Sequence, residues 1–175
     1  MRYALFLRAI NVAGHQTVTM ENIKGVHESL GHQNIASVLQ TGNILFDSEL
    51  AHHELLTAIQ AAYAKQLGLK TDLILKSAEQ LTPILNNCPY QPSPKFETKF
   101  IHCVFLSDSP TESAIKSFYA IAGPEKAQVV DDMLYVYYTD GAGRSKLTLK
   151  AIEKALDVKA TARNINTVSK ILAKR

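Results

Sequence analysis

The order in which strand-like and helix-like segments alternate constrains the fold of this 175-residue chain most. Residues 3–10 carry apolar side chains on both faces of an alternating pattern, which predicts a central strand. Thr19 suits the N-cap of a helix that ends at Gly31. Two further strands, residues 35–40 and 44–47, flank a turn with the composition of a hairpin.

A second helix completes the pattern of the first half. Its apolar residues recur at 3.6-residue spacing and Gly68 follows as a stop: Leu55, Leu56, Ile59, Ala62, Tyr63 and Leu67. Residues 71–76 then read as a strand. The order strand-helix-strand-strand-helix-strand predicts a ferredoxin-like (βαββαβ) unit.

A proline-rich stretch separates this pattern from the rest. Ser77 to Gln80 forms a capping box that opens a short helix, which Pro83 must bend or end. Three prolines within residues 88–95 mark a stiff connection. We therefore predict a ferredoxin-like subdomain over residues 1–88, a connection over 89–98 and a second α+β subdomain over 99–175.

The second half repeats the start of the first pattern. Residues 99–107 predict a strand, Ser109 predicts the N-cap of a helix that ends at Gly123, and a hairpin turns at Asp131-Asp132. A helix follows the hairpin, and Thr161 predicts the cap of a last helix. The expected fold is α+β, with the second subdomain a βαββα unit whose C-terminal helix replaces a fourth strand.

A basic glycine-containing loop, residues 140–148 (DGAGRSKLT), joins the last predicted hairpin to a helix. The first N–H groups of a helix lack partners within it, and glycines let a backbone approach an anion closely. Residues 141–175 hold nine Lys and Arg against two acidic residues, whereas the remainder holds ten against fourteen. This asymmetry indicates an anionic partner or a solvated helix face.

Composition limits the other classes of protein. The two cysteines, Cys88 and Cys103, have no metal-ligand spacing, which favours a reducing compartment. The N-terminal apolar run is too short for a signal sequence or a membrane span. We expect a cytoplasmic protein with no metal or cofactor and no membrane contact.

Four separated segments carry polar residues that packing alone does not require: LRAINVAG (7–14), QTGNILF (40–46), GRSKLT (143–148) and TARNINT (161–167). In this order they resemble the motifs LRGINVGG, IQSGNVVF, GRSKLT and TARNWNT of a bacterial family known as domain of unknown function 1697. The chain departs from that pattern at Ala9, Ala13 and Ile165. The resemblance implies a two-subdomain α+β protein and supplies no reaction.

Candidate ligand-binding residues come from these segments. They are Arg8, Asn11, Gln40, Asn43, Gly143, Arg144, Ser145, Lys146, Arg163, Asn164, Asn166 and Thr167. On a last helix, Arg163, Asn166, Thr167 and Lys170 would form one polar stripe. A buried Arg8 needs a ligand or an acid such as Asp47 as its partner, and the asparagines have turn and cap formation as an alternative role.

Familiar catalytic arrangements do not fit. The P-loop spacing is absent, the histidines lack metal-binding spacing, and no Ser/His/Asp order can be nominated. Asp140 could act as a base, although an Asp before Gly usually shapes a turn. No catalytic set follows from the residues.

Three functions fit these observations. The first is binding of a nucleotide, phosphorylated metabolite or carboxylate in a polar cleft between the subdomains, with Arg8, Lys146 and Arg163 as charge partners. The second is single-stranded nucleic acid stacked on aromatic residues of the strands, such as Phe6, Phe46, Tyr135 and Tyr137. The third is a non-enzymatic module whose basic end docks an acidic partner.

Overall fold

A computed structural model describes residues 1–8 and 18–174. The chain divides into two compact units: unit 1 comprises Met1–Thr82 with Lys170–Arg175, and unit 2 comprises Pro83–Ser169. Each unit contains one four-stranded antiparallel sheet with helices, so the predicted α+β fold with two subdomains is confirmed. The division falls between Thr82 and Pro83, and residues 170–175 group with unit 1.

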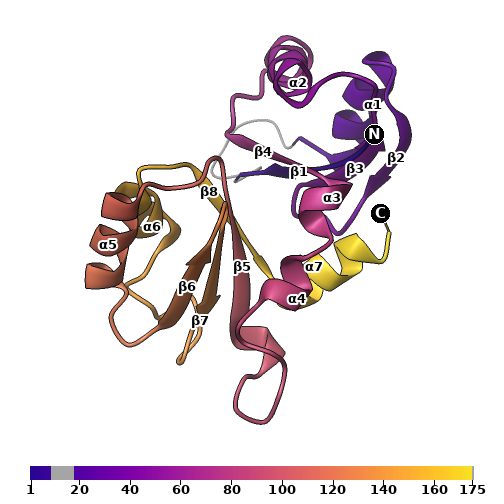
Figure 1. Cartoon of the computed structure of the whole chain (residues 1–175). Coiled ribbons are helices and arrows are strands. Elements are labelled where there is room, and N and C mark those ends of the chain that lie inside the picture. Colours follow the sequence, from indigo (N-terminus) through magenta and orange to yellow (C-terminus); the bar gives the residue numbers. More distant parts are fainter. Residues whose placement is uncertain (9–17, 175) are drawn as a thin grey trace. The chain divides into compact units, whose positions relative to one another are not determined.

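Unit 1 has the predicted strand and helix order (Figure 1). Its elements are β1 (Arg2–Leu7), α1 (Met20–Ser29), β2 (Gln33–Ser37), β3 (Asn43–Asp47), α2 (His52–Leu67) and β4 (Leu73–Ser77), followed by the short helix α3 (Ala78–Leu81). The sheet order is β2-β3-β1-β4, which makes β1 a central strand as predicted. This order of antiparallel strands is that of a ferredoxin-like unit.

The ends of the unit 1 helices follow from local sequence. The Thr19 hydroxyl accepts a hydrogen bond from Asn22 N at 3.1 Å, and the Asn22 side chain accepts one from Thr19 N in return. Gly68 ends α2 with a left-handed φ of 61°, which glycine adopts without the steric cost of a Cβ atom. Both caps were predicted from the sequence.

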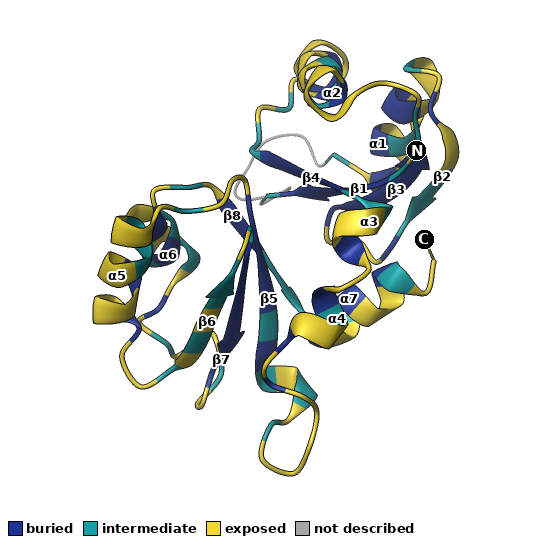
Figure 2. Cartoon of the chain, viewed as in Figure 1, coloured by how far each residue is buried: buried dark blue, intermediate teal, exposed yellow. Residues whose placement is uncertain are grey.

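The unit 1 core lies between the sheet and its two long helices (Figure 2). Tyr3, Leu5 and Leu7 point from β1 toward Ile23 of α1 and Ile59 of α2, and all five are buried. Ala4 and Phe6, on the other face of β1, are buried as well. Apolar residues on both faces are what the sequence of a central strand predicts.

Unit 2 has the same strand order as unit 1. Its elements are α4 (Ile84–Asn87), the 3-10 helix η1 (Thr98–Phe100), β5 (Ile101–Leu106), α5 (Glu112–Ile121), β6 (Lys126–Val130), β7 (Met133–Tyr137), α6 (Leu149–Leu156) and β8 (Ala160–Asn164). The sheet order is β6-β7-β5-β8. Helix α7 (Ile165–Leu172) follows β8 and runs into the residues assigned to unit 1.

The prediction that unit 2 lacks a fourth strand is wrong. Strand β8 pairs antiparallel with β5, with Cys103 opposite Arg163, and the last helix begins only at Ile165. Pairing with the edge of β5 satisfies backbone groups that a free helix start would expose, so tertiary context overrides the local capping signal of Thr161. Arg163 therefore lies on a strand and is not part of a polar stripe along a helix.

One other predicted helix start, that of α5, lies too early, whereas α6 begins directly after the predicted basic loop. The N-cap of α5 is Thr111, whose hydroxyl accepts from Ala114 N at 3.3 Å, rather than Ser109. The N-cap of α6 is Thr148, whose hydroxyl accepts from Ala151 N at 3.2 Å. Because α6 begins at Leu149, the GRSK residues precede the helix and do not form its first turn.

Within the described ranges, none of the helices is both long and apolar enough to cross a membrane.

Candidate functional site

Leu7 and Arg8, the described residues of the first polar segment, lie at the same end of the unit 1 sheet as the second polar segment. Leu7 N donates to Gly42 O at 2.9 Å, which joins the end of β1 to the loop before β3. Gly42 has a φ of 75°, a conformation that favours glycine at this turn. The fold thus brings together two segments that lie more than thirty residues apart in the sequence.

Arg8 is fixed at this end of the sheet by the segment before β4. Its N–H donates to Asp72 O at 3.1 Å, and the Thr71 hydroxyl donates to Arg8 O. Its guanidinium contacts the Asp72 carboxylate through Nη1 at 3.1 Å. The two side chains are 27% and 42% exposed, so the ion pair lies at the surface of the unit and not in its core.

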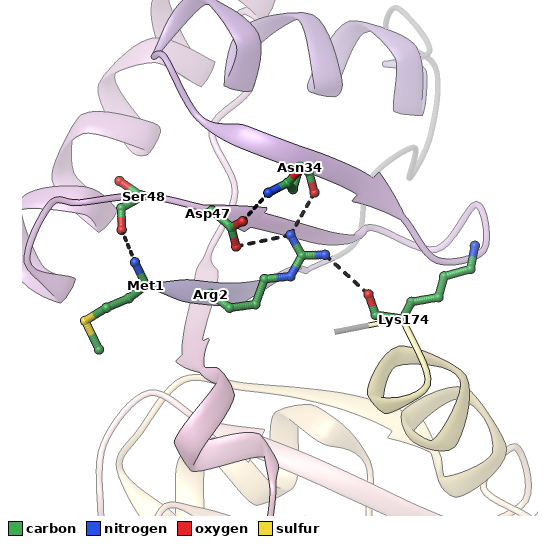
Figure 3. A network of polar contacts seen from close by, with 6 residues as sticks. All are labelled: Met1, Arg2, Asn34, Asp47, Ser48 and Lys174. Carbon is green, nitrogen blue, oxygen red and sulfur yellow. Dashed lines mark hydrogen bonds and ion pairs between the residues drawn. The ribbon is translucent and has the colours of Figure 1, made fainter.

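The acid partner of Arg8 is Asp72, whereas Asp47 pairs with Arg2 at the opposite end of β1. Arg2 Nη1 donates to Asp47 at 3.3 Å and to Asn34 O at 2.7 Å, and Arg2 Nη2 donates to Lys174 O at 3.3 Å (Figure 3). Asp47 therefore has a structural role as the partner of Arg2.

A cavity of about 690 Å³ opens beside Arg8 within unit 1. We name it the Arg8 cavity, and its polar lining comprises Arg8, Gln60, Tyr63, Lys70, Thr71 and Asp72. Among the residues that the structure describes, its charged lining consists of two cations, Arg8 and Lys70, and one carboxylate, Asp72. The arrangement combines excess positive charge with hydroxyl and amide groups that can hydrogen-bond a ligand.

Asn43 shapes its own loop. Its side-chain amide donates to Val38 O at 2.8 Å and to Thr41 Oγ1 at 2.9 Å, and the residue is only 2% exposed. This is the turn-forming role that the sequence left as an alternative. Gln40 is exposed in the same loop, and Asn11 lies outside the described residues.

The basic loop of unit 2 is a series of turns. Arg144 N donates to Gly141 O at 3.1 Å, and Ser145 N donates to Ala142 O at 3.4 Å. The Ser145 hydroxyl accepts from Leu147 N at 3.0 Å. These N–H groups already have acceptors inside the loop, whereas the Arg144 and Lys146 side chains are exposed. Any ligand contact from this loop therefore depends chiefly on its cationic side chains.

Within unit 2, the short helix η1 contacts the segment TARNINT and the residues that precede GRSKLT. Gly141 lies against the ring of Phe100, and Tyr138 N donates to Phe100 O at 3.0 Å. On the other motif, the Asn164 amide donates to three carbonyl oxygens, those of Thr98, Lys99 and Ile101, at 2.9, 3.0 and 3.2 Å. The residues just before GRSKLT and the segment TARNINT thus both contact η1.

Asn164 and Asn166 have different roles beside η1. Asn164 Oδ1 also accepts from Asn166 N at 2.9 Å, so every polar atom type of the Asn164 side chain is used in the fold. Asn166 is exposed and its amide makes a single contact with Thr98 Oγ1 at 3.2 Å. Thr167 is half-buried on α7.

Arg163 is a partly buried residue of β8. Its Nη1 donates to Thr161 Oγ1 and to Ala162 O, both at 2.8 Å. Burial lowers the pKa of the Arg163 guanidinium to about 10, so the group stays charged at neutral pH. Both of these contacts are to residues of its own strand.

The aromatic residues proposed to stack nucleic-acid bases are buried. Phe6 and Phe46 are 0% exposed, and Tyr135 and Tyr137 are 1% and 9% exposed. The Tyr135 hydroxyl donates to Ile84 O at 2.9 Å, and Tyr137 contacts the rings of Phe96 and Phe100. These rings do not offer a face to a single strand.

Sequence reasoning did not find several of the residues around Arg8. Gln60, Lys70, Thr71 and Asp72 belong to α2 and the segment after it, where no motif marks them. A usable signal was the polar run Lys70-Thr71-Asp72 directly before an apolar strand. The prediction that Arg8 shares a cleft with Lys146 and Arg163 stays a prediction, since the two units are described separately.

No group of three or more His, Cys, Asp or Glu side chains with the geometry of a metal site occurs in the two described ranges. Cys88 and Cys103 are both buried, and burial raises the pKa of each thiol.

Two units of βαββαβ order, each with one four-stranded antiparallel sheet, place the chain among α+β proteins built from paired ferredoxin-like units. The chain belongs to a family described as protein of unknown function (DUF1697), whose model matches residues 1–135. The segments GRSKLT and TARNINT lie beyond the matched residues.

A solved structure shares the fold. It is the conserved bacterial protein SP0830 from Streptococcus pneumoniae, which is similar with a TM-score of 0.71 and 23% sequence identity over 99% of this chain and 97% of that one. No curated protein matches the sequence.

Proposed function

We propose that unit 1 binds a small anionic molecule, such as a carboxylate or a phosphorylated metabolite, in the Arg8 cavity. The observation that carries the proposal is the position of Arg8 and Lys70 on the wall of one cavity of about 690 Å³. Ligand cavities in proteins commonly have volumes of about 300 to 1,000 Å³. The cavity is thus large enough for a metabolite and too small for a folded partner.

The chemistry of the lining favours an oxyanion. A guanidinium presents N–H donors in a planar fork that matches a carboxylate or a phosphate, and an ammonium group adds a point charge. Gln60 adds an amide that can donate to the ligand and fix its orientation, whereas the Thr71 hydroxyl already donates to Arg8 O. Both Arg8 and Thr71 are themselves held by backbone contacts, which reduces the ordering cost of binding.

Asp72 allows a test in which two substitutions should change the affinity for the anion in opposite directions. Its carboxylate contacts Arg8 at 3.1 Å, so it competes with an incoming anion for the guanidinium and repels that anion. Asp72→Asn keeps the side-chain shape and removes the negative charge. The substitution should therefore strengthen anion binding, whereas Arg8→Gln should weaken it.

The experiment is a thermal-shift screen of the wild-type chain with phosphate, citrate and a set of anionic metabolites, followed by calorimetric titration of each hit. Arg8→Gln and Lys70→Gln should each raise the Kd about tenfold, because a hydrogen bond to a charged group contributes about 1.5–3 kcal/mol. Asp72→Asn should lower the Kd several-fold. Lys65→Gln is the control, since Lys65 is an exposed lysine of α2 outside the cavity lining.

Stability without ligand separates binding from folding. The Arg8–Asp72 pair is partly exposed, so its removal should cost at most about 1 kcal/mol of unfolding free energy. If no anion stabilises the wild type, or if Asp72→Asn weakens binding as much as Arg8→Gln does, the proposal is wrong. A loss of binding on Lys146→Gln alone would move the site to the basic loop.

A further inference from the structure

Two histidines form a buried pair in unit 1, between the end of α1 and the start of β2. His27 Nδ1 and His32 Nδ1 are 2.8 Å apart, and His27 Nε2 lies 2.8 Å from the Tyr63 hydroxyl oxygen. Both imidazole rings pack on Phe46, with centroid distances of 4.5 and 4.4 Å. His27 is 0% and His32 7% exposed, so water does not screen the pair.

One placement of the protons leaves the fewest buried groups of the described residues without a partner. In the described part of the chain, the Tyr63 hydroxyl has His27 Nε2 as its hydrogen-bond partner, so it satisfies its proton by donating to that nitrogen. His27 then carries its proton on Nδ1 and donates it to His32 Nδ1. His32 must carry its own proton on Nε2, which has no acceptor among the described residues.

This arrangement has no place for an additional proton. A proton added to His32 must bind Nδ1, where it would face the Nδ1–H of His27 across 2.8 Å. A proton added to His27 must bind Nε2, where it would displace the hydroxyl proton of Tyr63. Either proton breaks a buried hydrogen bond and leaves a charge in an apolar setting, which is costly.

His32 has space and opposite charge beside it. It lines a second cavity, of about 750 Å³, whose charged groups are the Met1 ammonium, Arg2, Asp47 and Glu49. Arg2 is engaged with Asp47, Asn34 O and Lys174 O, and the Met1 ammonium donates to Ser48 O at 2.6 Å (Figure 3). Glu49 is exposed at the rim.

The remaining groups that face the pair are neutral. Tyr63 reaches it from α2, and Phe46 packs on it from β3. Tyr3 of β1 stacks on Phe46 at 6.0 Å, and its hydroxyl donates to Leu50 O at 3.2 Å. Among the described residues, the carboxylates nearest His32 are therefore those of Asp47 and Glu49 in the second cavity, and neither forms an ion pair with the closed His27–His32 pair.

We propose that the His27–His32 pair is an acid-sensitive latch that holds the turn between α1 and β2. Acidification places a proton on His32, breaks the Nδ1–Nδ1 contact and moves the His32 ring into the second cavity toward Glu49 and Asp47. Movement of the ring also pulls on the backbone of residue 32 and so releases the turn. The turn is held by two backbone hydrogen bonds, from His32 N to His27 O at 3.1 Å and from Gly31 N to Glu28 O at 3.0 Å.

The direction of the effect follows from burial. Burial lowers the pKa of both imidazoles in the closed state, so the open state binds protons more readily. The closed state therefore dominates near neutral pH and is lost as the pH falls below the ordinary histidine value of about 6.5.

The experiment follows the rings and the turn separately. Ring ¹⁵N NMR between pH 7.5 and 4.5 should show His32 change from the neutral Nε2–H form to the imidazolium form while unit 1 remains folded. The exposed His53 serves as the reference ring. Amide hydrogen exchange, corrected for intrinsic pH dependence, should show the protection of the His32 and Gly31 amides fall about tenfold between pH 7 and pH 5.

His32→Asn is the matched variant, since its amide oxygen can accept from His27 Nδ1–H and does not titrate. Its turn should keep the same protection at pH 7 and pH 5. The proposal is overturned if the wild-type His32 ring stays neutral at pH 4.5 in the folded protein. It is also overturned if the protection of the wild-type turn does not change between pH 7 and pH 5, or if His32→Asn loses the same protection as the wild type. The ring spectra need the wild type only, so they decide the question even if the variant does not fold.

Discussion

Asn164→Asp tests whether Asn164 is a structural clamp of unit 2 or a ligand contact. The substitution keeps the size of the side chain and the Oδ1 acceptor used by Asn166 N. It replaces the amide donor that contacts the carbonyls of Thr98, Lys99 and Ile101 with a second oxygen. Lost donors and repelled acceptors should both destabilise the fold.

The contacts give the magnitude of this change. The amide has two N–H groups, so its three contacts amount to two hydrogen bonds, and at about 1 kcal/mol net each their loss costs about 2 kcal/mol. A carboxylate facing three carbonyl oxygens adds a desolvation and repulsion cost, so we expect a total of about 3 kcal/mol at pH 7.

The repulsion also sets a pH dependence. Carbonyl neighbours raise the pKa of the new carboxyl group in the folded state above its unfolded value. The protonated form restores one donor, so the variant should approach the wild type below about pH 4 and lose stability as the pH rises.

Urea unfolding at pH 7 and pH 4 measures both effects, with Asn166→Asp as the control. Asn166 is exposed and contributes one amide contact of 3.2 Å, so its substitution should change the unfolding free energy by at most about 0.5 kcal/mol. Equal stability of the two variants at pH 7 would refute the clamp. If Asn164→Asp is as stable as the wild type but no longer binds the ligand, Asn164 is a ligand contact and not a structural clamp.

Three further predictions concern stability and can be checked by urea unfolding. Gly141→Ala should cost about 1 kcal/mol because Gly141 has a φ of 86° and lies against Phe100, whereas Gly143→Ala, with open space around its Cβ position and no positive φ, should be near neutral; equal costs would contradict this reading of the loop. Asn43→Ala should cost about 2 kcal/mol, since it removes two hydrogen bonds from a buried amide, and a neutral result would show that the loop closes without them. Burial lowers the pKa of His27 from 6.5 to about 3, so between pH 7 and pH 5 the unfolded chain binds more protons than the folded one. Over this range the unfolding free energy of the wild type should therefore fall by about 2 kcal/mol more than that of His27→Gln. Parallel pH profiles of the two proteins would contradict this prediction.

The fold of unit 1 could be predicted from the sequence because its signals are local. The capping residue Thr19, the stop at Gly68 and the two-sided apolar pattern of β1 each depend on neighbours within a few positions. Unit 2 departs from prediction where the structure depends on distant pairing. The segment Ala160–Asn164 has a helix-capping threonine, yet the edge of β5 makes it a strand.

The residues of the candidate site could likewise be predicted only in part. Arg8 could be selected because a charged residue beside a central apolar strand needs a partner. The polar run Lys70-Thr71-Asp72 is visible in the sequence, but only the antiparallel pairing of β1 with β4 shows that it lies beside Arg8. The sequence does not distinguish a structural asparagine from a ligand-binding one. Only the hydrogen-bond partners of Asn43 and Asn164 show that both stabilise the fold.

The most direct test of the proposed function is a crystal of the wild-type chain soaked in selenate, with anomalous diffraction to locate the oxyanion. We predict a selenium peak in the Arg8 cavity, in contact with Arg8 and Lys70, that disappears in Arg8→Gln and strengthens in Asp72→Asn. A peak confined to Arg144 and Lys146, or an Arg8 cavity without a peak in both wild type and Asp72→Asn, would contradict the account.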